Sequence, residues 1–314
     1  MSSATPATTS SFTLSDASAH PSSLRWLVVG ADGMLGRELL SSLRQDGANV
    51  LGTSRREGSQ HLRLDLSEIG GETDLPPADI VILTAAMTRI ADCESDPKTS
   101  HRINVSAPLS LAKHAWQEHN AFVVFISSSG VFDGVNELPN PQTHPRPLNL
   151  YGRQKTEAEA ALTEAAVDNF GLAIIRPTKI LGPSTPLLVE WETALTRGTV
   201  IRPHAWRSMA PLSVRWATRA IATIAADRAA GIWHLSAAED VSFADFANKW
   251  VASRGFPSHL IHPEEHSEIS PSRARLDMQA TMQRFRLSSP TLDTVVSDLI
   301  TPPLDGPIRE ERTA

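Results

Sequence analysis

Residues 25–36 read Arg25-Trp26-Leu27-Val28-Val29-Gly30-Ala31-Asp32-Gly33-Met34-Leu35-Gly36. The apolar run before Gly30 predicts a short strand, and the apolar spacing after Gly33 predicts a helix that starts at a glycine turn. In such a turn the first glycine permits the bend, the second lets backbone N–H groups approach a pyrophosphate, and the third lets the helix pack on the strand. Turns also use glycine for conformational reasons alone, but the position between strand and helix favours a dinucleotide. Its expected contacts are Gly30, Asp32, Gly33, Met34, Leu35 and Gly36.

Further apolar runs predict the rest of a parallel sheet. They lie at residues 49–53, 61–64, 79–84, 121–126, 172–178 and 232–235. Helical patterns separate most of them, and the run at 79–84 is typical of a strand that is buried on both faces. The predicted fold is therefore α/β: a doubly wound parallel Rossmann sheet with a small, mostly C-terminal substrate-binding lobe.

The same reasoning divides the chain into two bodies. Residues 24–177, with the strand near 232–235, form the expected NAD(P)-binding Rossmann domain. Residues 178–230 and 236–300 form the expected substrate-binding lobe.

The two ends of the chain have a different composition. Residues 1–23 are rich in Ser, Thr, Ala and Pro, without the pattern of a signal peptide, so we expect a disordered extension. Residues 301–314 are expected to form a flexible polar tail.

Composition and charge narrow the classes of partner. The 314 residues carry a formal net charge of −6 without a basic stripe, which argues against a nucleic-acid groove or an anionic membrane surface. No run approaches the 18 or so apolar residues of a membrane span. The single Cys93 has no second cysteine with which to form a disulfide, and it lacks the partner residues that a metal cluster needs. We therefore expect a cytoplasmic protein without a metal site, and a homodimer is left open.

The residues after the second predicted strand bear on the choice of cofactor. They read Thr53-Ser54-Arg55-Arg56. At this place an acidic residue would bind a ribose 2′-hydroxyl, whereas an arginine accommodates a 2′-phosphate. Two guanidiniums and a hydroxyl favour NADP, because guanidinium geometry matches phosphate. NAD is the alternative, with the arginines in a solvated basic loop.

Later strand ends supply the other expected cofactor contacts. Asp65 is expected to face the adenine ring, and the small Ala85 and Ala86 leave room for a cofactor across the sheet edge. The remaining expected contacts are Leu66, Met87, Asn104 and Pro177. For Asn104, a surface polar residue is the alternative interpretation.

Tyr151 is the only tyrosine of the chain, and Lys155 follows it by four residues. On a helix this spacing places both side chains on one face, so the ammonium can favour the phenolate and lower the tyrosine pKa toward the range of an acid–base catalyst. An ordinary amphipathic helix with a half-buried Tyr and a solvated Lys is the alternative. The hydroxyl of Ser128 ends a predicted central strand upstream, where a carbonyl substrate would lie, and this favours a catalytic site.

The ordered glycine turn, strand-end serine and Tyr-Lys pair resemble the extended short-chain dehydrogenase/reductase superfamily, and within it the dTDP-4-dehydrorhamnose reductase group of RmlD-like sugar-nucleotide-binding proteins. Residues 126–134 (ISSSGVFDG) resemble that group's IS-T-D-Y-VFDG, and residues 147–155 (PLNLYGRQK) resemble its P-x-N-x-YG-x-x-K. Residues 271–277 (PSRARLD) are a loose echo of its late RP-x-x-S-x-LD. The likeness extends over roughly residues 24–300.

The resemblance implies an NADPH-dependent oxidoreductase, a reductase of a nucleotide-activated 4-keto-deoxysugar. Ser128 would hydrogen-bond the substrate carbonyl, Tyr151 would donate the proton, and Lys155 would lower the tyrosine pKa while contacting the nicotinamide ribose. Ser129 and Gly130 stand where the group has an acidic residue and a tyrosine, so the identity of the sugar is open. The same positions argue against the related nucleotide-sugar 4,6-dehydratases, which need an Asp-Glu pair there.

Two other functions are compatible with these residues. A nucleotide-sugar 4-epimerase would use the same three residues and hold NAD tightly. A noncatalytic binding subunit, similar to the regulatory partner of methionine adenosyltransferase, resembles the same group, although the intact Ser, Tyr and Lys argue against complete loss of chemistry. In the variable lobe, the candidates for contacting a substrate diphosphate are Arg202, His204, Trp206, Arg207, Arg273 and Arg275.

Overall fold

The computed structural model describes residues 23–69, 74–135, 138–166, 171–265 and 273–301. Almost all of the predicted N-terminal extension and C-terminal tail therefore lies outside the described residues. Among the helices within the described ranges, none is long and apolar enough to cross a membrane.

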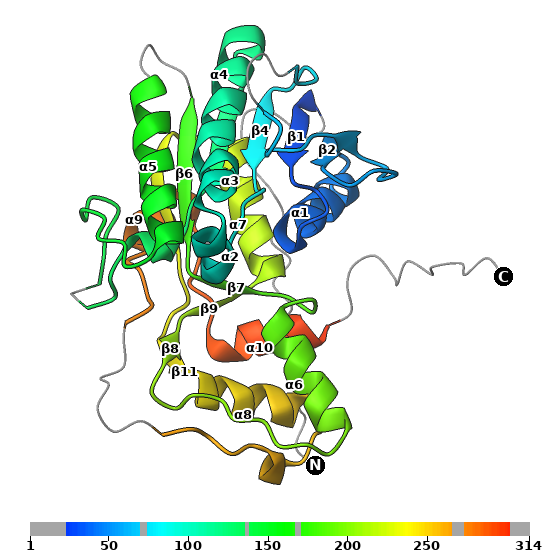
Figure 1. Ribbon diagram of the computed structural model, residues 1–314, viewed down its shortest axis with the longest axis vertical. Helices are drawn as coiled ribbons and strands as arrows, with labels where there is room; N and C mark the ends of the chain where they lie inside the picture. The colour runs from blue at the N-terminus through cyan, green and yellow to red at the C-terminus, as the bar shows by residue number, and fades with distance from the viewer. Residues whose placement is uncertain (1–22, 70–73, 136–137, 167–170, 266–272, 302–314) are drawn as a thin grey trace, which may run out of the picture.

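A seven-stranded sheet forms the centre of the larger body (Figure 1). Its order is β10-β6-β5-β4-β1-β2-β3, and every neighbouring pair is parallel. The strands are β1 (Arg25–Val29), β2 (Asn49–Ser54), β3 (Leu62–Arg63), β4 (Ile80–Leu83), β5 (Phe122–Ile126), β6 (Leu172–Pro177) and β10 (Gly231–Leu235). The predicted doubly wound parallel sheet is confirmed, and the late strand returns to pair with β6.

Helices cover both faces of this sheet because side chains alternate along each strand. In β1, Trp26 and Val28 pack toward one face, and Leu27 and Val29 toward the other. The covering helices are α1 (Met34–Gln45) and α7 (Val214–Ala226) on the first face, and α4 (Ala107–His119) and α5 (Leu150–Ala165) on the second. Burial on both faces explains why the central strands are apolar throughout.

The helical region between β4 and β5 that contains Asn104 has three consecutive segments. α3 (Pro97–His101) passes through a π-helical turn (Arg102–Ser106) into α4. The turn carries Asn104. π-Helical turns are rare in proteins overall, and those that occur are often found at functional sites. The helix ends at Asn120, whose φ of 48° gives it the left-handed conformation of a helix C-cap.

A smaller lobe lies below the sheet in Figure 1. Its apolar core joins helices and short strands from the second half of the chain. These elements include α6 (Pro186–Thr196), β8 (Ser208–Met209), β11 (Val241–Ser242), α8 (Phe243–Ser253) and α10 (Leu292–Ile300).

Two helices within the predicted lobe segments pack on the sheet instead. α7 has an apolar stripe that shares the core of α1, so it belongs to the Rossmann layers. α9 (Gln279–Phe285) lies beside β10, where the rings of Phe285 and Trp233 are 4.8 Å apart. The lobe is therefore smaller than residues 178–230 and 236–300.

The carboxyl ends of the strands lie at the junction between the two bodies. β6 ends at Pro177, and β7 (Lys179–Leu181) begins two residues later and pairs with β9 (Pro211–Ser213) at that junction (Figure 1). Ligands of open α/β sheets bind at this edge. The fold thus brings the residues that follow β1, β2, β4 and β5 to one place.

Candidate active site

The glycine turn connects β1 to α1, and at Gly30 and Gly36 it leaves no room for a side chain. Gly30 has a φ of +94°, and a Cβ placed on it would lie 2.8 Å from the Cβ of Ala85. A Cβ on Gly36 would lie 2.2 Å from the carbonyl oxygen of Gly30. Gly33 caps α1 without a side chain, so the first N–H groups of the helix have no side-chain cap. These N–H groups are free to donate hydrogen bonds at the positive end of the helix, and the glycines let a ligand approach the backbone closely. Both features suit the binding of a pyrophosphate.

The end of β2 holds polar residues from two segments. The hydroxyl of Ser54 donates a hydrogen bond to the carboxylate of Asp32, which comes from the glycine turn. Arg55 and Arg56 follow on the surface. The structure therefore places Ser54, the first of the predicted 2′-phosphate residues, beside a carboxylate.

Asp65 and Leu66 follow β3 at the same edge of the sheet. The Asp65 carboxylate accepts hydrogen bonds from the backbone N–H and the hydroxyl of Ser67, at 2.9 and 2.7 Å. Burial acts to raise the pKa of Asp65, but these bonds and the charges of Arg55 and Arg63 together lower it. Asp65 is thus held as a carboxylate, and Leu66 is buried in the sheet core.

Asn104 is fully buried and links three segments, so it is not a surface residue. Its Oδ1 accepts from the Met87 N–H at 2.9 Å, and its Nδ2 donates to the Met87 carbonyl at 3.0 Å. The same Nδ2 donates to Gln154 at 2.8 Å, and Gln154 donates to Ser100 at 2.9 Å. Asn104 therefore fixes the loop after β4, which contains Ala85 and Ala86, relative to α5.

Ser128 and Tyr151 come together over Gly130. The hydroxyl oxygen of Ser128 accepts a hydrogen bond from the Gly130 N–H at 3.0 Å. A Cβ on Gly130 would lie 3.3 Å from that oxygen and 3.9 Å from the Tyr151 ring. Asn149 caps α5 by accepting from the Gly152 N–H at 2.9 Å, which sets the first turn that carries Tyr151. The two predicted catalytic hydroxyls thus lie at one point of the sheet edge.

The pKa of Tyr151 differs from the expectation. Burial raises it to about 12, although a hydrogen bond with the Ser128 side chain acts to lower it. The phenol is therefore protonated at neutral pH, which is the form that a proton donor requires.

Lys155 is buried on the face of α5 that meets the sheet. Its Nζ lies 3.9 Å from the centroid of the Phe125 ring, and only 1% of the residue is exposed. Burial lowers the pKa of Lys155 to about 7, and the charge of Glu159 acts to raise it. A lysine with this pKa is partly neutral at neutral pH, and the groups that shift the pKa of Tyr151 do not include Lys155.

A buried ion pair supports this helix and was not expected from the sequence. Arg176 of β6 donates to both carboxylate oxygens of Glu159, with Nη2–Oε2 and Nε–Oε1 distances of 2.5 and 3.0 Å. The hydroxyl of Ser127 also donates to Glu159. Glu159 follows Lys155 by one helical turn, and that spacing is the signal that could have identified it.

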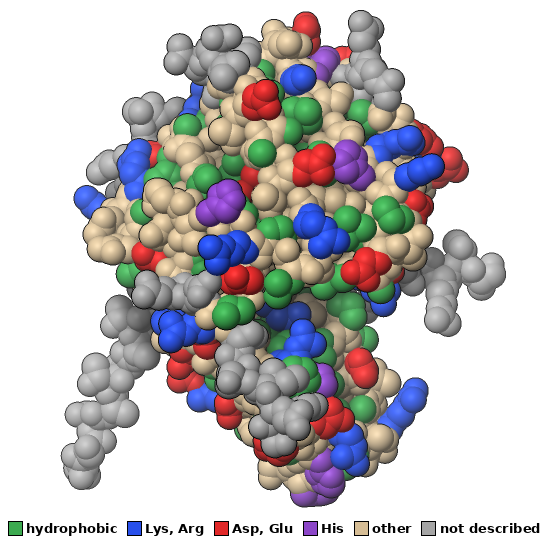
Figure 2. All heavy atoms as spheres, turned by 60° about the vertical axis from the view of Figure 1, so that its left-hand side comes forward, with side chains coloured by type: hydrophobic (Ala, Val, Ile, Leu, Met, Phe, Trp, Pro, Cys, Tyr) green, Lys and Arg blue, Asp and Glu red, His purple; other side chains and the backbone are tan. Residues whose placement is uncertain are grey.

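The lobe contributes a cluster of two cations and three aromatic rings at the junction. The Cζ of Arg207 lies 5.8 Å from the Trp206 ring and 6.0 Å from the Phe243 ring. The Nζ of Lys179 lies 5.7 Å from the Phe243 ring, and the rings of His204 and Trp206 are 5.1 Å apart. Loss of hydration around the ammonium group and then the charge of Arg207 lower the pKa of Lys179. Figure 2 shows Lys and Arg side chains where the two bodies meet.

The other predicted lobe cations have no cation–ring contact with this cluster among the described residues. Arg202 is exposed on the same segment as this cluster. The backbone N–H of Arg273 donates to the Gly134 carbonyl at 3.0 Å, and the side chain of Arg275 donates to the Ala238 carbonyl at 2.6 Å. The structure thus groups His204, Trp206 and Arg207, and it adds Lys179 and Phe243, which sequence reasoning missed because β7 and α8 are far apart in the chain.

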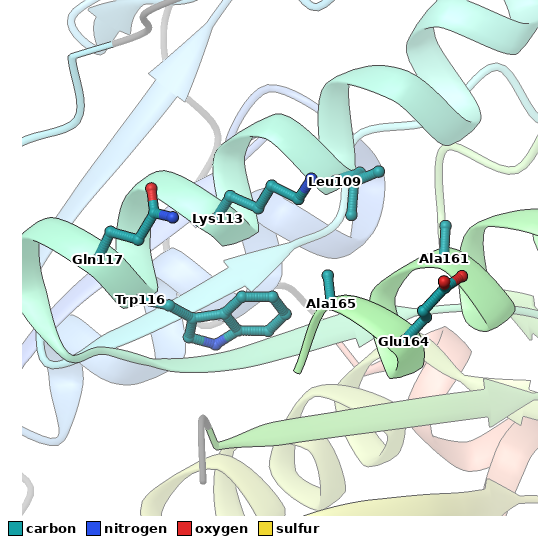
Figure 3. Close-up of a pocket in the computed structure, with 7 residues that line it drawn as sticks. All are labelled: Leu109, Lys113, Trp116, Gln117, Ala161, Glu164 and Ala165. Atoms are coloured by element: carbon teal, nitrogen blue, oxygen red, sulfur yellow. The ribbon is translucent and has the colours of Figure 1, made fainter. Parts of the chain in front are cut away.

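A cavity of 410 Å³ lies between α4 and α5, away from these residues (Figure 3). It is lined by Leu109, Lys113, Trp116, Gln117, Ala161, Glu164 and Ala165. It contains none of the predicted site residues, so the candidate active site is the sheet edge beside the lobe.

Comparison with known proteins identifies the same architecture. Residues 24–302 match the family model described as RmlD substrate binding domain. The chain is 31% identical over 219 residues to dTDP-4-dehydrorhamnose reductase of Streptomyces griseus, covering 67% of this chain and 69% of the relative. It is 26% identical over 272 residues to methionine adenosyltransferase 2 subunit beta of Bos taurus, covering 81% of this chain and 80% of the relative.

Solved structures show the same fold at lower sequence identity. The dTDP-4-dehydrorhamnose reductase of Bacillus anthracis str. Ames, in complex with NADP, superimposes with a TM-score of 0.75 at 20% identity, and the match covers 88% of this chain and 97% of the other. The family model covers almost all of the described residues, from β1 to the end of α10. The chain therefore belongs to the RmlD substrate binding domain family.

Proposed function

We propose that this chain is an NADPH-dependent reductase of a nucleotide-activated 4-keto-deoxysugar, with Tyr151 as the proton donor. The observation that carries the proposal is the position of Ser128 and Tyr151 together at the carboxyl edge of the sheet, with Lys155 buried one helical turn after Tyr151. The glycine turn that fits a pyrophosphate lies at the same edge. Family membership and the dTDP-4-dehydrorhamnose reductase relative support the substrate class.

The protonation states suit reduction of a carbonyl. The nicotinamide would supply the hydride. Ser128 accepts from Gly130 and keeps its own hydroxyl proton, which can donate to the carbonyl oxygen of the substrate. Tyr151, with its pKa raised to about 12, holds the proton that the developing alkoxide takes up. Positioned donors of this kind stabilise the charge that develops on the oxygen in the transition state.

A panel of substrates tests the proposal. NADPH oxidation is followed optically with nucleotide-linked 4-keto-deoxysugars and, as controls, with small aldehydes and ketones. We expect turnover with a nucleotide-linked keto-sugar and little with the controls. Turnover of the small carbonyls alone would contradict the assigned substrate class.

The cofactor preference is tested at the end of β2. Replacing both Arg55 and Arg56 with Ala should weaken NADPH binding about tenfold or more and leave NADH binding nearly unchanged, because only NADPH carries the 2′-phosphate that guanidinium groups bind. Fluorescence titration of both cofactors measures the two affinities. The matched control is Arg44→Ala, a basic residue in the last turn of α1. Equal losses for NADPH and NADH would contradict the NADP preference.

We also propose that the junction cluster binds the diphosphate of the substrate. Lys179 and Arg207 carry like charges near one ring, and neither forms an ion pair with a carboxylate among the described residues. An anion between them would relieve that repulsion through charge-assisted hydrogen bonds. Trp206, which is half-buried, offers a face on which the base can stack.

Substitution of Lys179 and Arg207 distinguishes specific binding of a diphosphate from nonspecific attraction to a basic surface. Lys179→Met and Arg207→Met should each weaken the binding of dTDP roughly tenfold, which corresponds to about 1.4 kcal/mol. Arg202→Met removes an exposed cation from the same segment and should leave the affinity unchanged. Isothermal titration calorimetry with dTDP measures all three, and an Arg202 effect as large as the others would mean nonspecific attraction.

A second candidate function rests on the match to methionine adenosyltransferase 2 subunit beta, which extends over 81% of this chain. A noncatalytic regulatory subunit would bind NADPH and leave it unoxidised with every carbonyl of the panel. A 4-epimerase would instead keep a nicotinamide cofactor through purification, which the absorption spectrum of the isolated protein detects.

A further inference from the structure

A carboxylate from the glycine turn lies at the carboxyl end of β2. The hydroxyl of Ser54 donates to Oδ2 of Asp32, and the hydroxyl of Ser59 lies 3.5 Å from the same oxygen. The Nε2 of His61 lies 3.7 Å from Oδ1. The fold therefore brings Asp32 from the first loop to residues that follow the second strand.

The contact with Asp32 occupies the only hydrogen-bond donor of the Ser54 side chain. A serine hydroxyl has one proton to donate, and here it goes to Asp32. The same oxygen accepts the N–H of Arg56 at 3.0 Å. Ser54 consequently has no free proton to donate to a 2′-phosphate. The sequence alone predicts Ser54 as one of the groups that bind this phosphate.

Asp32 is also accessible to a ligand. Its side chain is 26% exposed, whereas the side chain of His61 behind it is 6% exposed. At the end of the second strand of a dinucleotide-binding sheet, a carboxylate accepts a hydrogen bond from the ribose 2′-hydroxyl. A 2′-phosphate at the same place would bring two like charges within a few ångströms, and that repulsion is large near a protein surface.

Charges of opposite sign, two arginines and one carboxylate, thus lie near the end of β2. Arg55 and Arg56 are exposed and can reach a phosphate from the solvent side. Arg55 also interacts electrostatically with Asp65 and helps to lower the pKa of that carboxylate. The carboxylate of Asp32 acts against the arginines from the side of the glycine turn.

We propose that Asp32 is a specificity-determining residue, whose carboxylate accepts the ribose 2′-hydroxyl of NADH and opposes the 2′-phosphate of NADPH. The inference rests on the proposed function, because it requires a nicotinamide dinucleotide in the glycine turn.

Titration of both cofactors into Asp32→Ala tests this role. We expect NADPH to bind more tightly and NADH more weakly, so that the ratio of the two dissociation constants changes at least tenfold in favour of NADPH. Asp32→Asn keeps an acceptor for Ser54 but removes the charge, and it should shift the ratio in the same direction by less. Asp46→Asn, at the opposite end of α1, removes the same charge and should leave the ratio unchanged.

The outcomes distinguish this role from support of the loop alone. A ratio within twofold of wild type in both Asp32 variants would overturn the inference, and so would equal loss of both cofactors in both variants. In either case the wild-type protein still binds its cofactor and the proposed function stands. Failure of the wild-type protein to bind NADPH or NADH would overturn the proposed function together with this inference.

Discussion

Replacing Tyr151 with Phe is expected to lower turnover about 10²- to 10⁴-fold, the contribution that a positioned proton donor makes to a reaction. The affinity for NADPH should stay within a few fold of wild type, because the ring and its packing over Gly130 are retained. Steady-state kinetics with the active keto-sugar measure the first effect, and fluorescence titration of NADPH measures the second.

The control for this variant is Thr156→Val. Thr156 lies on the same helix, and its hydroxyl donates only to the Gly152 carbonyl one turn earlier, at 3.0 Å. Loss of that hydroxyl should leave turnover near wild type. If Tyr151→Phe also kept turnover within a few fold of wild type, the phenol would not be the proton donor.

The sheet was predictable because its signals are local. Apolar runs such as Ile80–Leu83 reveal buried strands, and the glycines after β1 reveal the turn. The grouping of Ser128 with Tyr151 also followed, since hydroxyls at strand ends and a helix that starts at the same edge must meet.

What the sequence did not reveal are contacts between residues far apart in the chain. Asp32 reaches Ser54 across 22 positions of sequence, and Glu159 meets Arg176 from another strand. The pKa of Tyr151 was expected to fall because of Lys155, but burial of both side chains determines the result. Burial and long-range pairing depend on the packed structure, which a pattern of residues along the chain does not specify.

Replacing Glu159 with Leu is expected to lower the free energy of unfolding by about 3 to 5 kcal/mol, because removing one partner of a buried ion pair leaves the other charge unpaired. Arg176 is 2% exposed and Glu159 is 5% exposed, so neither charge can turn to water. Urea denaturation measures the change. Glu164→Leu, an exposed acid on the same helix, is the control and should have little effect.

A second substitution separates the unpaired charge from lost packing. Combining Glu159→Leu with Arg176→Leu removes both charges, and the double variant should be more stable than Glu159→Leu alone. A double variant that is less stable than either single variant would show that packing, and not charge pairing, accounts for the loss.

The milder Glu159→Gln should change the pH dependence of turnover through Lys155. The charge of Glu159 raises the pKa of Lys155 against the effect of burial, which brings it to about 7. Without that charge the pKa falls further, so less of the lysine is protonated at neutral pH. If turnover requires the ammonium form, activity declines as the pH rises through the lysine pKa, and Glu159→Gln moves this decline to lower pH. The pH profile of kcat measures the midpoint, and an unchanged midpoint in a folded variant would mean that Lys155 does not act as a cation in the reaction.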